Sequence, residues 1–208
     1  MKQWIALAAL AAVSVGAQAQ TYPGSKPVSI VVPFTAGGPT DRVARDLAEA
    51  MRKQIPGSNF VVENAAGAGG TIGAAKVAKA APDGHTLLMA AVGNVVLQPM
   101  LSKQGGADLV AKLRPVSTVS TAPHVLVTSG KLPIRSVQEL VDYARANPGK
   151  LSYGSTGVLT SPHLTMELVA QKLGIELLHV PYKGSADLMQ AILGGQLMAA
   201  ADSTATGA

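Results

Sequence analysis

A strand–glycine–helix unit near the start of the chain, residues 28–54, constrains the fold more than any other segment. Val28–Val32 is rich in β-branched residues and predicts a strand. Gly37 and Gly38 follow it, and residues 41–54 then carry apolar side chains at helical spacing. Glycine lets the backbone approach a ligand closely, and a helix directs its unpaired N–H groups toward the loop that precedes it. The unit therefore indicates either an anion site made of backbone or a tight strand-to-helix turn.

The alternation of strand and helix continues along the chain, with glycines between the elements. Further strands are expected at 60–63, 86–91, 116–119, 125–127, 151–153, 175–180 and 197–201. Further helices are expected at 71–80, 137–146, 162–173 and 186–193, the second of them opened by a capping box at 136–139. Residues 99–115 show no such pattern and are expected to form a surface connection. This order predicts an α/β fold in which parallel or mixed sheets are flanked by helices.

Residues 1–19 have the features of a secretory leader. Lys2 supplies a positive start, residues 4–15 form a short apolar run, and Ala17-Gln18-Ala19 is a small-residue cleavage signature. We therefore expect cleavage after Ala19 and export of the product, a destination compatible with the periplasm of a Gram-negative cell. No later stretch is long and apolar enough to span a bilayer, and the chain has no cysteine. The exported product is expected to be soluble and free of disulfides.

The composition argues against a nucleic-acid-binding protein. The formal net charge is +5, but the basic residues are scattered, and aromatic residues make up only 3% of the chain. Proteins that bind nucleic acids more often show a basic stripe with aromatic side chains for stacking. The mild positive balance is compatible with an anionic ligand.

Three patterns that could carry other chemistry are incomplete. Gly67, Gly69 and Gly73 miss the spacing of a dinucleotide-binding loop by one residue. The loop around Ser155 lacks the spacing of a hydrolase nucleophile turn, although Ser155 with His163 leaves a secreted serine-type hydrolase open. The four histidines show no metal-binding spacing, so neither a metal nor a cofactor is expected.

A set of short motifs follows in order along the chain and covers nearly all of it after the leader. The set consists of Pro-Phe-Thr-Ala-Gly-Gly-Pro-Thr-Asp-Arg-Val-Ala-Arg at 33–45, Val-Val-Glu-Asn at 61–64, Gly-Ala-Gly-Gly-Thr-Ile-Gly at 67–73, Pro-Asp-Gly-His-Thr-Leu-Leu at 82–88, Pro-Gly-Lys-Leu-Ser-Tyr-Gly-Ser at 148–155, His-Leu at 163–164, His-Val-Pro-Tyr-Lys-Gly at 179–184 and Leu-Gly-Gly-Gln at 193–196. Together these motifs resemble the periplasmic solute receptors of tripartite tricarboxylate transporters, also called the Bug family.

The resemblance implies a two-lobed periplasmic binding protein whose α/β lobes close on a small ligand by a hinge motion. The first lobe is expected at 20–122 and the second at 123–200, with 201–208 starting a return crossover to the first lobe. Family members continue beyond this point, so the resemblance implies an incomplete first lobe and low stability for residues 20–208. The chain departs from the family pattern at two further places. Ala65 stands where an arginine is usual, and residues 101–114 lack the tyrosine- and aspartate-rich composition that is typical there.

The resemblance also implies where a ligand carboxylate lies, namely between two small-residue loops and partly through ordered water. Gly93 and Asn94, which follow the third expected strand, are added as candidates for discrimination between ligands. Asp41 suits the first turn of a helix equally well, and Arg45 is most simply a solvated helix residue. The expected contacts are Phe34, Thr35, Ala36, Gly37, Gly38 and Asp41 in the first loop, Gly154, Ser155, Thr156, Gly157 and His163 in or after the second, and Asp202 at the crossover.

These expectations predict a solute-capture protein rather than an enzyme. It would bind a small organic carboxylate as a monomer and deliver it to the membrane permease subunits of the transporter, without binding nucleic acid. The hydrolase that uses Ser155 and His163 is the alternative from another class. A sensory or scaffolding protein that reuses the receptor fold is a third possibility.

Overall fold

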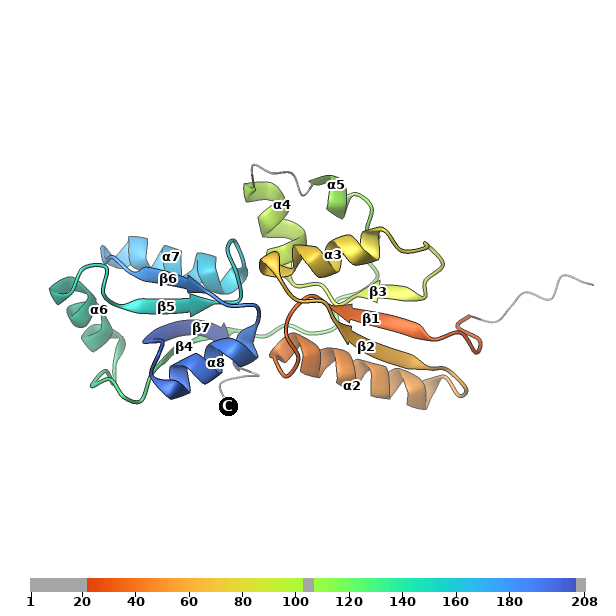
Figure 1. Ribbon diagram of the computed structural model, residues 1–208, viewed down its shortest axis with the longest axis horizontal. Coiled ribbons are helices and arrows are strands. Elements are labelled where there is room, and N and C mark those ends of the chain that lie inside the picture. Colours follow the sequence, from red (N-terminus) through yellow and green to blue (C-terminus); the bar gives the residue numbers. More distant parts are fainter. Residues whose placement is uncertain (1–21, 103–106, 205–208) are drawn as a thin grey trace, which may run out of the picture.

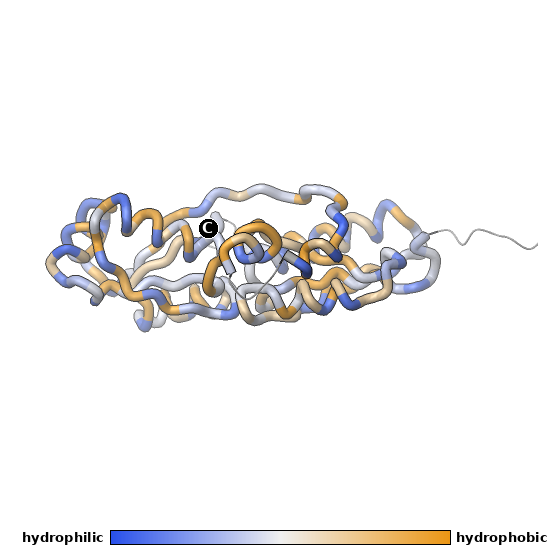
Figure 2. The backbone as a smooth tube through the Cα atoms, turned by 90° about the horizontal axis from the view of Figure 1, so that it is seen from above, coloured by the Kyte–Doolittle hydropathy of each residue, from blue (hydrophilic) through white to orange (hydrophobic). Residues whose placement is uncertain are grey.

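The computed structural model describes residues 22–102 and 107–204, which form two α/β lobes lying side by side along the long axis of the molecule (Figure 1). The expected leader and its cleavage site lie outside the described residues. Figure 2 shows hydrophobic residues along both lobes rather than in one central cluster. This distribution agrees with the separate hydrophobic cores of the lobes.

The first lobe is built on a three-stranded parallel sheet in the order β2-β1-β3. Its strands are β1 (Val28–Val32), β2 (Phe60–Asn64) and β3 (Thr86–Leu88). Helices α2 (Pro39–Gln54) and α3 (Thr71–Ala78) lie on opposite faces of this sheet (Figure 1). Strand β1 is buried along most of its length because it is the central strand of a parallel sheet with a helix on each face.

The second lobe is built on a mixed four-stranded sheet in the order β4-β7-β5-β6. Strand β7 runs antiparallel to β4 and parallel to β5. The strands are β4 (His124–Thr128), β5 (Ser152–Ser155), β6 (Leu178–Pro181) and β7 (Ala199–Ser203), and the helices are α6 (Val137–Ala146), α7 (Ser161–Leu173) and α8 (Ser185–Gly194). One core lies between the sheet and helices α6 and α7, and a second lies under α8.

Local signals in the sequence account for several helix ends. The Ser136 hydroxyl accepts a hydrogen bond from the Glu139 N–H at 3.2 Å, as the capping box predicts. The Glu139 carboxylate reaches back to the Arg135 N–H at 2.5 Å, one residue before the cap. Helix α7 ends at Gly174, whose φ of 60° lies in the left-handed region that favours glycine.

The connection between the lobes differs most from the expectations. A π-helical turn η2 (Gly93–Leu97) runs into α4 (Gln98–Leu101), and a short α5 (Ala107–Val110) follows. Helix α5 and most of α4 lie within residues 99–115, for which the sequence predicts only a surface connection. The strand predicted at 116–119 is wrong, because residues 114–123 form an irregular connection in which Val116 is exposed. The strand predicted at 86–91 ends at Leu88.

Strand β7 runs through Ser203 and pairs with β4 up to that residue. Residues 201–203, expected to begin a return crossover, thus lie in the second sheet. In the part of the chain that the structure describes, no helix is long and apolar enough to cross a membrane.

Candidate functional site

The two lobes meet first at the loop between β1 and α2. A Cβ on Gly38 would lie 3.7 Å from the Ser185 Cβ, and a Cβ on Gly37 would lie 3.9 Å from the Ala186 Cβ. Both partners lie in the first turn of α8, in the second lobe. The loop that the sequence predicts as the first half of a ligand site therefore faces the N-terminus of α8, where helix N–H groups favour negative charge.

Asp41 fixes the conformation of this loop through four hydrogen bonds. Its Oδ2 accepts from the Gly37 N–H and from Arg45 Nε, each at 2.9 Å. Its Oδ1 accepts from a second Arg45 nitrogen at 3.0 Å and from Asn64 Nδ2 at 2.9 Å. Burial by itself raises the pKa of Asp41, but the bonds from Arg45, Gly37 and Asn64 outweigh it and hold the pKa below its ordinary value. With both oxygens engaged, the carboxylate holds the loop in place.

The lobes meet a second time at the glycine turn that precedes α3. A Cβ on Gly157, in the second lobe, would lie only 2.7 Å from the Gly69 Cα in the first. Gln98 adds a hydrogen bond between the lobes, because its Nε2 donates to the Val158 carbonyl at 2.8 Å and to the Ala68 carbonyl of its own lobe at 3.3 Å. Gly93 also packs against the start of α7, at Thr160 and Ser161.

A cleft of about 440 Å³ opens beside this second contact. Among the described residues that line it, Lys183 is the only one with a charged side chain. The first lobe supplies the turn 68–71 with η2, α4 and α5, and the second lobe supplies residues 157–159 and 181–183. The cleft has the size of a small-molecule site, and its single charge favours an anion.

Two buried side-chain amides lie in the wall of the cleft. Asn94 is fully buried and Gln98 is 8% exposed. Asn94 Oδ1 accepts from the Ala91 N–H at 2.9 Å. The nitrogen of the Asn94 amide, Nδ2, and the oxygen of the Gln98 amide, Oε1, are buried without a hydrogen-bond partner among the residues that the structure describes. Asn94 is thus in the cleft, as the sequence suggested, whereas Gln98 was not anticipated.

A polar cluster lies beneath the loop that follows β5. Tyr153 pairs with His179 across strands β5 and β6, so their side chains share a face with Ser155, two residues along the strand. Ser155 Oγ lies 2.7 Å from His179 Nε2, and the ring centroids of His163 and His179 lie 4.2 Å apart. Glu167, one helical turn after His163, accepts a hydrogen bond from the Tyr153 hydroxyl.

Burial keeps the imidazoles of this cluster neutral. The pKa of His179 is lowered to about 4, first by burial and then by the nearby His163, although Glu167 acts in the opposite direction. Burial also lowers the pKa of His163, against a smaller opposing effect of Glu167. The pKa of the Tyr153 hydroxyl is raised by burial and by its bond to Glu167. The two imidazoles therefore act as neutral hydrogen-bonding groups at pH 7.

The cluster does not support the Ser155–His163 pair of the alternative hydrolase. Ser155 bonds to His179, whereas His163 Nδ1 accepts from the Leu159 N–H at 3.3 Å. Ser155 is also fully buried, and its Oγ accepts from the Gly157 N–H at 3.2 Å. A substrate carbonyl has no access to this hydroxyl. Ser155 and His163 instead hold the loop 157–160, in which Leu159 has a φ of 61°.

The remaining predicted ligand contacts range from exposed to fully buried residues. Phe34 is buried in the core of the first lobe, and a Cβ on Gly154 would clash with Leu197 in the second. Thr35 Oγ1 is buried without a partner in the described part of the chain, next to Gly184. Ala36 and Gly37 are exposed, and Thr156 is buried. Asp202 is buried, and its Oδ1 accepts from Ser185 Oγ at 2.9 Å.

Sequence reasoning missed Arg45, Asn64, Gln98, His179 and the cleft residue Lys183 as parts of the site. Asn64 and His179 stand in motifs at 61–64 and 179–184 that were noted without a role. The sequence alone indicates a solvated helix residue at Arg45, yet Arg45 is one helical turn from Asp41, a spacing at which an ion pair forms. No sequence pattern indicates that Gln98 lies in the cleft, because its position depends on the π-helical turn before it.

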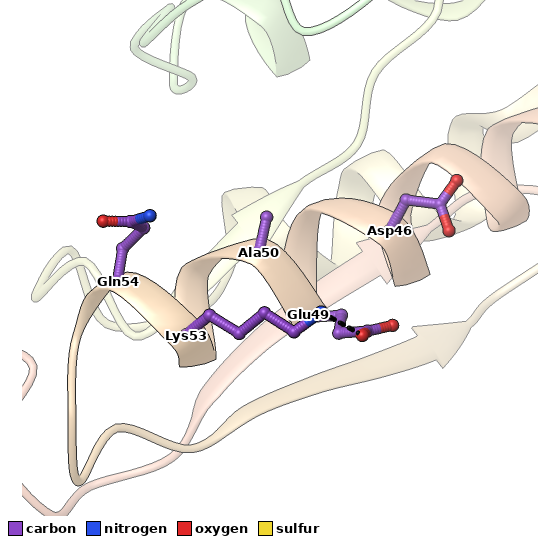
Figure 3. Close-up of a pocket in the computed structure, with 5 residues that line it drawn as sticks. All are labelled: Asp46, Glu49, Ala50, Lys53 and Gln54. Carbon is purple, nitrogen blue, oxygen red and sulfur yellow. Dashed lines mark ion pairs between the residues drawn. The ribbon is translucent and has the colours of Figure 1, made fainter.

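A second depression, of about 330 Å³, lies on the outer side of α2 and carries no site (Figure 3). It is lined by side chains of that one helix, and an ion pair of 2.6 Å between Glu49 and Lys53 lies along it. Such i,i+4 pairs are typical of a solvated helix surface. Within the described residues, no cluster of three His, Asp or Glu side chains could hold a metal ion.

Comparison with known families matches residues 43–208 to the tripartite tricarboxylate transporter family receptor. A curated relative from Cupriavidus necator, the UPF0065 protein in the gbd 5' region, is 43% identical over 196 residues, which cover 94% of this chain and 59% of the relative. The chain spans between 51% and 59% of the length of the first curated relatives that it matches.

Solved structures share both the fold and part of the sequence. The periplasmic binding protein BugD is 37% identical, with a TM-score of 0.73 over 86% of this chain and 59% of its own. Rpa4515 of R. palustris, solved with adipate, is 34% identical, with a TM-score of 0.82 over 88% of this chain and 60% of its own. MatC from Rhodopseudomonas palustris, solved with bound malate, is 31% identical, with a TM-score of 0.79 over 85% of this chain and 60% of its own. These neighbours confirm the α/β architecture of a periplasmic binding protein.

Proposed function

This chain belongs to the tripartite tricarboxylate transporter receptor family, and we propose that it captures a small organic carboxylate in the cleft between its lobes. The family and the similar solved structures are periplasmic binding receptors rather than enzymes. Two of these neighbours were solved with dicarboxylates, adipate and malate. A ligand of this class has the negative charge and the size that the cleft requires.

The observation that carries the proposal is the composition of the cleft wall. Lys183 supplies a positive charge at the cleft, while the rest of the described lining consists of apolar side chains, neutral polar side chains and glycine backbone. A carboxylate placed near Lys183 gains a charge-assisted hydrogen bond, which is stronger than a bond between neutral groups. Because both lobes contribute lining residues, a ligand in the cleft would favour their closed arrangement.

We further propose that the protein acts as a monomeric receptor that hands its ligand to the permease subunits of the transporter. Family membership supports this role. The leader expected at 1–19, cut after Ala19, would direct the export that such a receptor needs. Of the contacts expected from the sequence, Asn94 and Gly157 line this cleft and remain proposed ligand contacts, whereas no residue of the first loop is among its described lining residues.

Isothermal titration of the full-length chain with malate and adipate tests the proposal. We expect binding of at least one acid, and weaker binding of its neutral diamide, because the diamide lacks the charge that Lys183 recognises. Lys183→Gln should weaken binding of the acid about fivefold to tenfold, the size of one partly exposed charge-assisted hydrogen bond. Lys172→Gln, on the last turn of α7, is the matched control and should leave the affinity unchanged.

A folded protein that bound neither the acids nor their diamides would overturn the capture role. Equal binding of acid and diamide would overturn the recognition of a carboxylate by Lys183. The melting temperature of each variant, measured without ligand, shows whether a loss of binding comes from a loss of folded protein.

A further inference from the structure

The two amides in the cleft wall, Asn94 and Gln98, are oriented by the backbone around them. Asn94 Oδ1 accepts from the Ala91 N–H, and Gln98 Nε2 donates to the carbonyls of Ala68 and Val158. A carbonyl only accepts and a backbone N–H only donates, so these contacts determine which end of each amide is oxygen and which is nitrogen. The orientation leaves one donor, Asn94 Nδ2, and one acceptor, Gln98 Oε1.

These two atoms belong to side chains that lie next to each other. Asn94 and Gln98 are four residues apart in the continuous helical segment formed by η2 and α4. They also pack on adjacent residues of the glycine turn, since a Cβ on Gly70 would lie 2.9 Å from Asn94 Nδ2 and a Cβ on Gly69 would lie 2.1 Å from Gln98 Nε2. Both residues line the cleft.

Both atoms are buried and have no hydrogen-bond partner in the described part of the protein. Buried polar atoms in folded proteins nearly always have a partner, because leaving one unpaired is costly. Two such atoms of opposite kind in one cleft wall indicate a partner that both donates and accepts.

We propose that Asn94 and Gln98 form a subsite for a ligand hydroxyl, so that the solute captured in the cleft is a hydroxycarboxylate. The hydroxyl accepts from Asn94 Nδ2 and donates to Gln98 Oε1. A carboxylate oxygen fits this subsite poorly, because it only accepts and would face the Gln98 oxygen. The carboxylate is instead held on the side of Lys183. This inference rests on the proposed function and specifies the solute within it.

Malate and succinate test the subsite, because they share a four-carbon dicarboxylate skeleton and differ in one hydroxyl. We expect the full-length protein to bind malate about tenfold or more tightly than succinate, the effect of two neutral hydrogen bonds in a buried site. Gln98→Met keeps the approximate size of the side chain and removes the acceptor, and Asn94→Leu removes the donor. Each variant should reduce the malate-to-succinate affinity ratio toward one.

The ratio is the decisive quantity, because both acids are titrated into the same preparation and a smaller folded fraction cancels from it. Gln138→Met, on α6 of the second lobe, is the matched control and should keep the ratio of the original protein. Binding of both acids with equal affinity, or a ratio that both variants preserve, would mean that the amides hold only water and would overturn the subsite while the capture role stands. Failure to bind any carboxylate would overturn the capture role, and the subsite with it.

Discussion

Asp41 is a buried carboxylate that positions the first loop without lining the candidate cleft. It is 3% exposed, and its four hydrogen bonds come from the loop, from its own helix and from the neighbouring strand. Arg45 also lies 3.3 Å from the Asn64 side-chain oxygen, so the three side chains form one network. The network couples the position of the first loop to the sheet and makes Asp41 a positioning residue.

Asp41→Asn should destabilise the protein by about 1–3 kcal/mol. The substitution keeps the shape of the side chain but replaces an ionised acceptor by an amide, one end of which can only donate. Half of the Arg45 side chain is exposed, so solvent reduces the loss of the ion pair itself. Urea unfolding of the full-length chain measures the effect, and Asp46→Asn, at an exposed position of the same helix, serves as the control. Similar losses for both variants would refute the structural role of Asp41.

At the scale of elements, strands β5 and β6 and helix α7 enclose the cluster of Tyr153, Ser155, His163, Glu167 and His179. The stacked rings of Tyr153 and His179, with centroids 4.9 Å apart, lie below the loop that reaches the cleft. Ser155 links this cluster to the loop through Gly157. Protonation of His179 therefore changes the support of a cleft-lining loop rather than a group that contacts the ligand.

The lowered pKa of His179 predicts a loss of stability in mild acid. The folded protein takes up its proton near pH 4, whereas the unfolded chain does so near the ordinary value of 6.5. Between these values the unfolded state binds more protons, so the free energy of unfolding falls as the pH falls from about 6.5 to about 4. Allowing for solvent at a half-buried ring, we expect His179 to contribute about 1–2 kcal/mol to this fall.

His179→Gln tests this assignment, because glutamine forms hydrogen bonds but does not titrate. Unfolding in urea at pH 7 and pH 4.5 should show a smaller difference between the two pH values for the variant. His124→Gln changes an exposed histidine on β4 and should keep the original difference. If His179→Gln kept it as well, the acid sensitivity would have to come from other groups.

The sequence predicted elements well where a local pattern and its tertiary surroundings agree. The strand at 28–32 and the helix after it were predicted because the β-branched run becomes a central parallel strand and the helical spacing becomes a buried face. Residues 116–119 have the same β-branched character but pair with no described strand, so propensity alone was misleading there. The Ser155–His179 contact depends on the register of β5 against β6, which no single segment encodes.

At the scale of the whole molecule, the two contacts between the lobes involve mostly backbone and small side chains. Gly37 and Gly38 meet the start of α8, and Gly69 meets Gly157. Glycine at 69 is required twice, since its φ of 62° is left-handed and a side chain there would meet the amide of Gln98. The glycine motifs noted in the sequence thus permit close approach of the lobes, but the contacts differ from the expected pair of facing loops at 34–41 and 154–157, because the first loop meets α8 and Gly157 meets Gly69.

Gly69→Ala should weaken binding of every ligand of the cleft without disrupting either lobe. Its Cβ would lie 2.1 Å from Gln98 Nε2 and 3.1 Å from the Val158 carbonyl oxygen, so the hydrogen bond that joins the lobes cannot keep its geometry. A smaller population of the closed arrangement raises the apparent dissociation constant by the same factor for all ligands. We expect a loss of about tenfold or more for succinate, measured by titration of the full-length chain, and a larger loss for malate, because the displaced Gln98 amide also disturbs the proposed hydroxyl subsite.

Gly174→Ala is the matched control, because Gly174 has a φ of 60° and a Cβ there would meet nothing within 4 Å. Both substitutions impose nearly the same backbone strain, so Gly174→Ala separates the effect of strain from that of the contact with Gln98, and only Gly69→Ala should lose affinity. Hydrogen exchange gives a second measure that needs no ligand. The amides of residues 157–160 should exchange faster in Gly69→Ala, because the neighbouring lobe no longer covers them. Equal affinities in the two variants would mean that the Gln98–Val158 contact does not contribute to closure, and the geometry of the closed cleft would then have to be maintained by the loop that Asp41 holds.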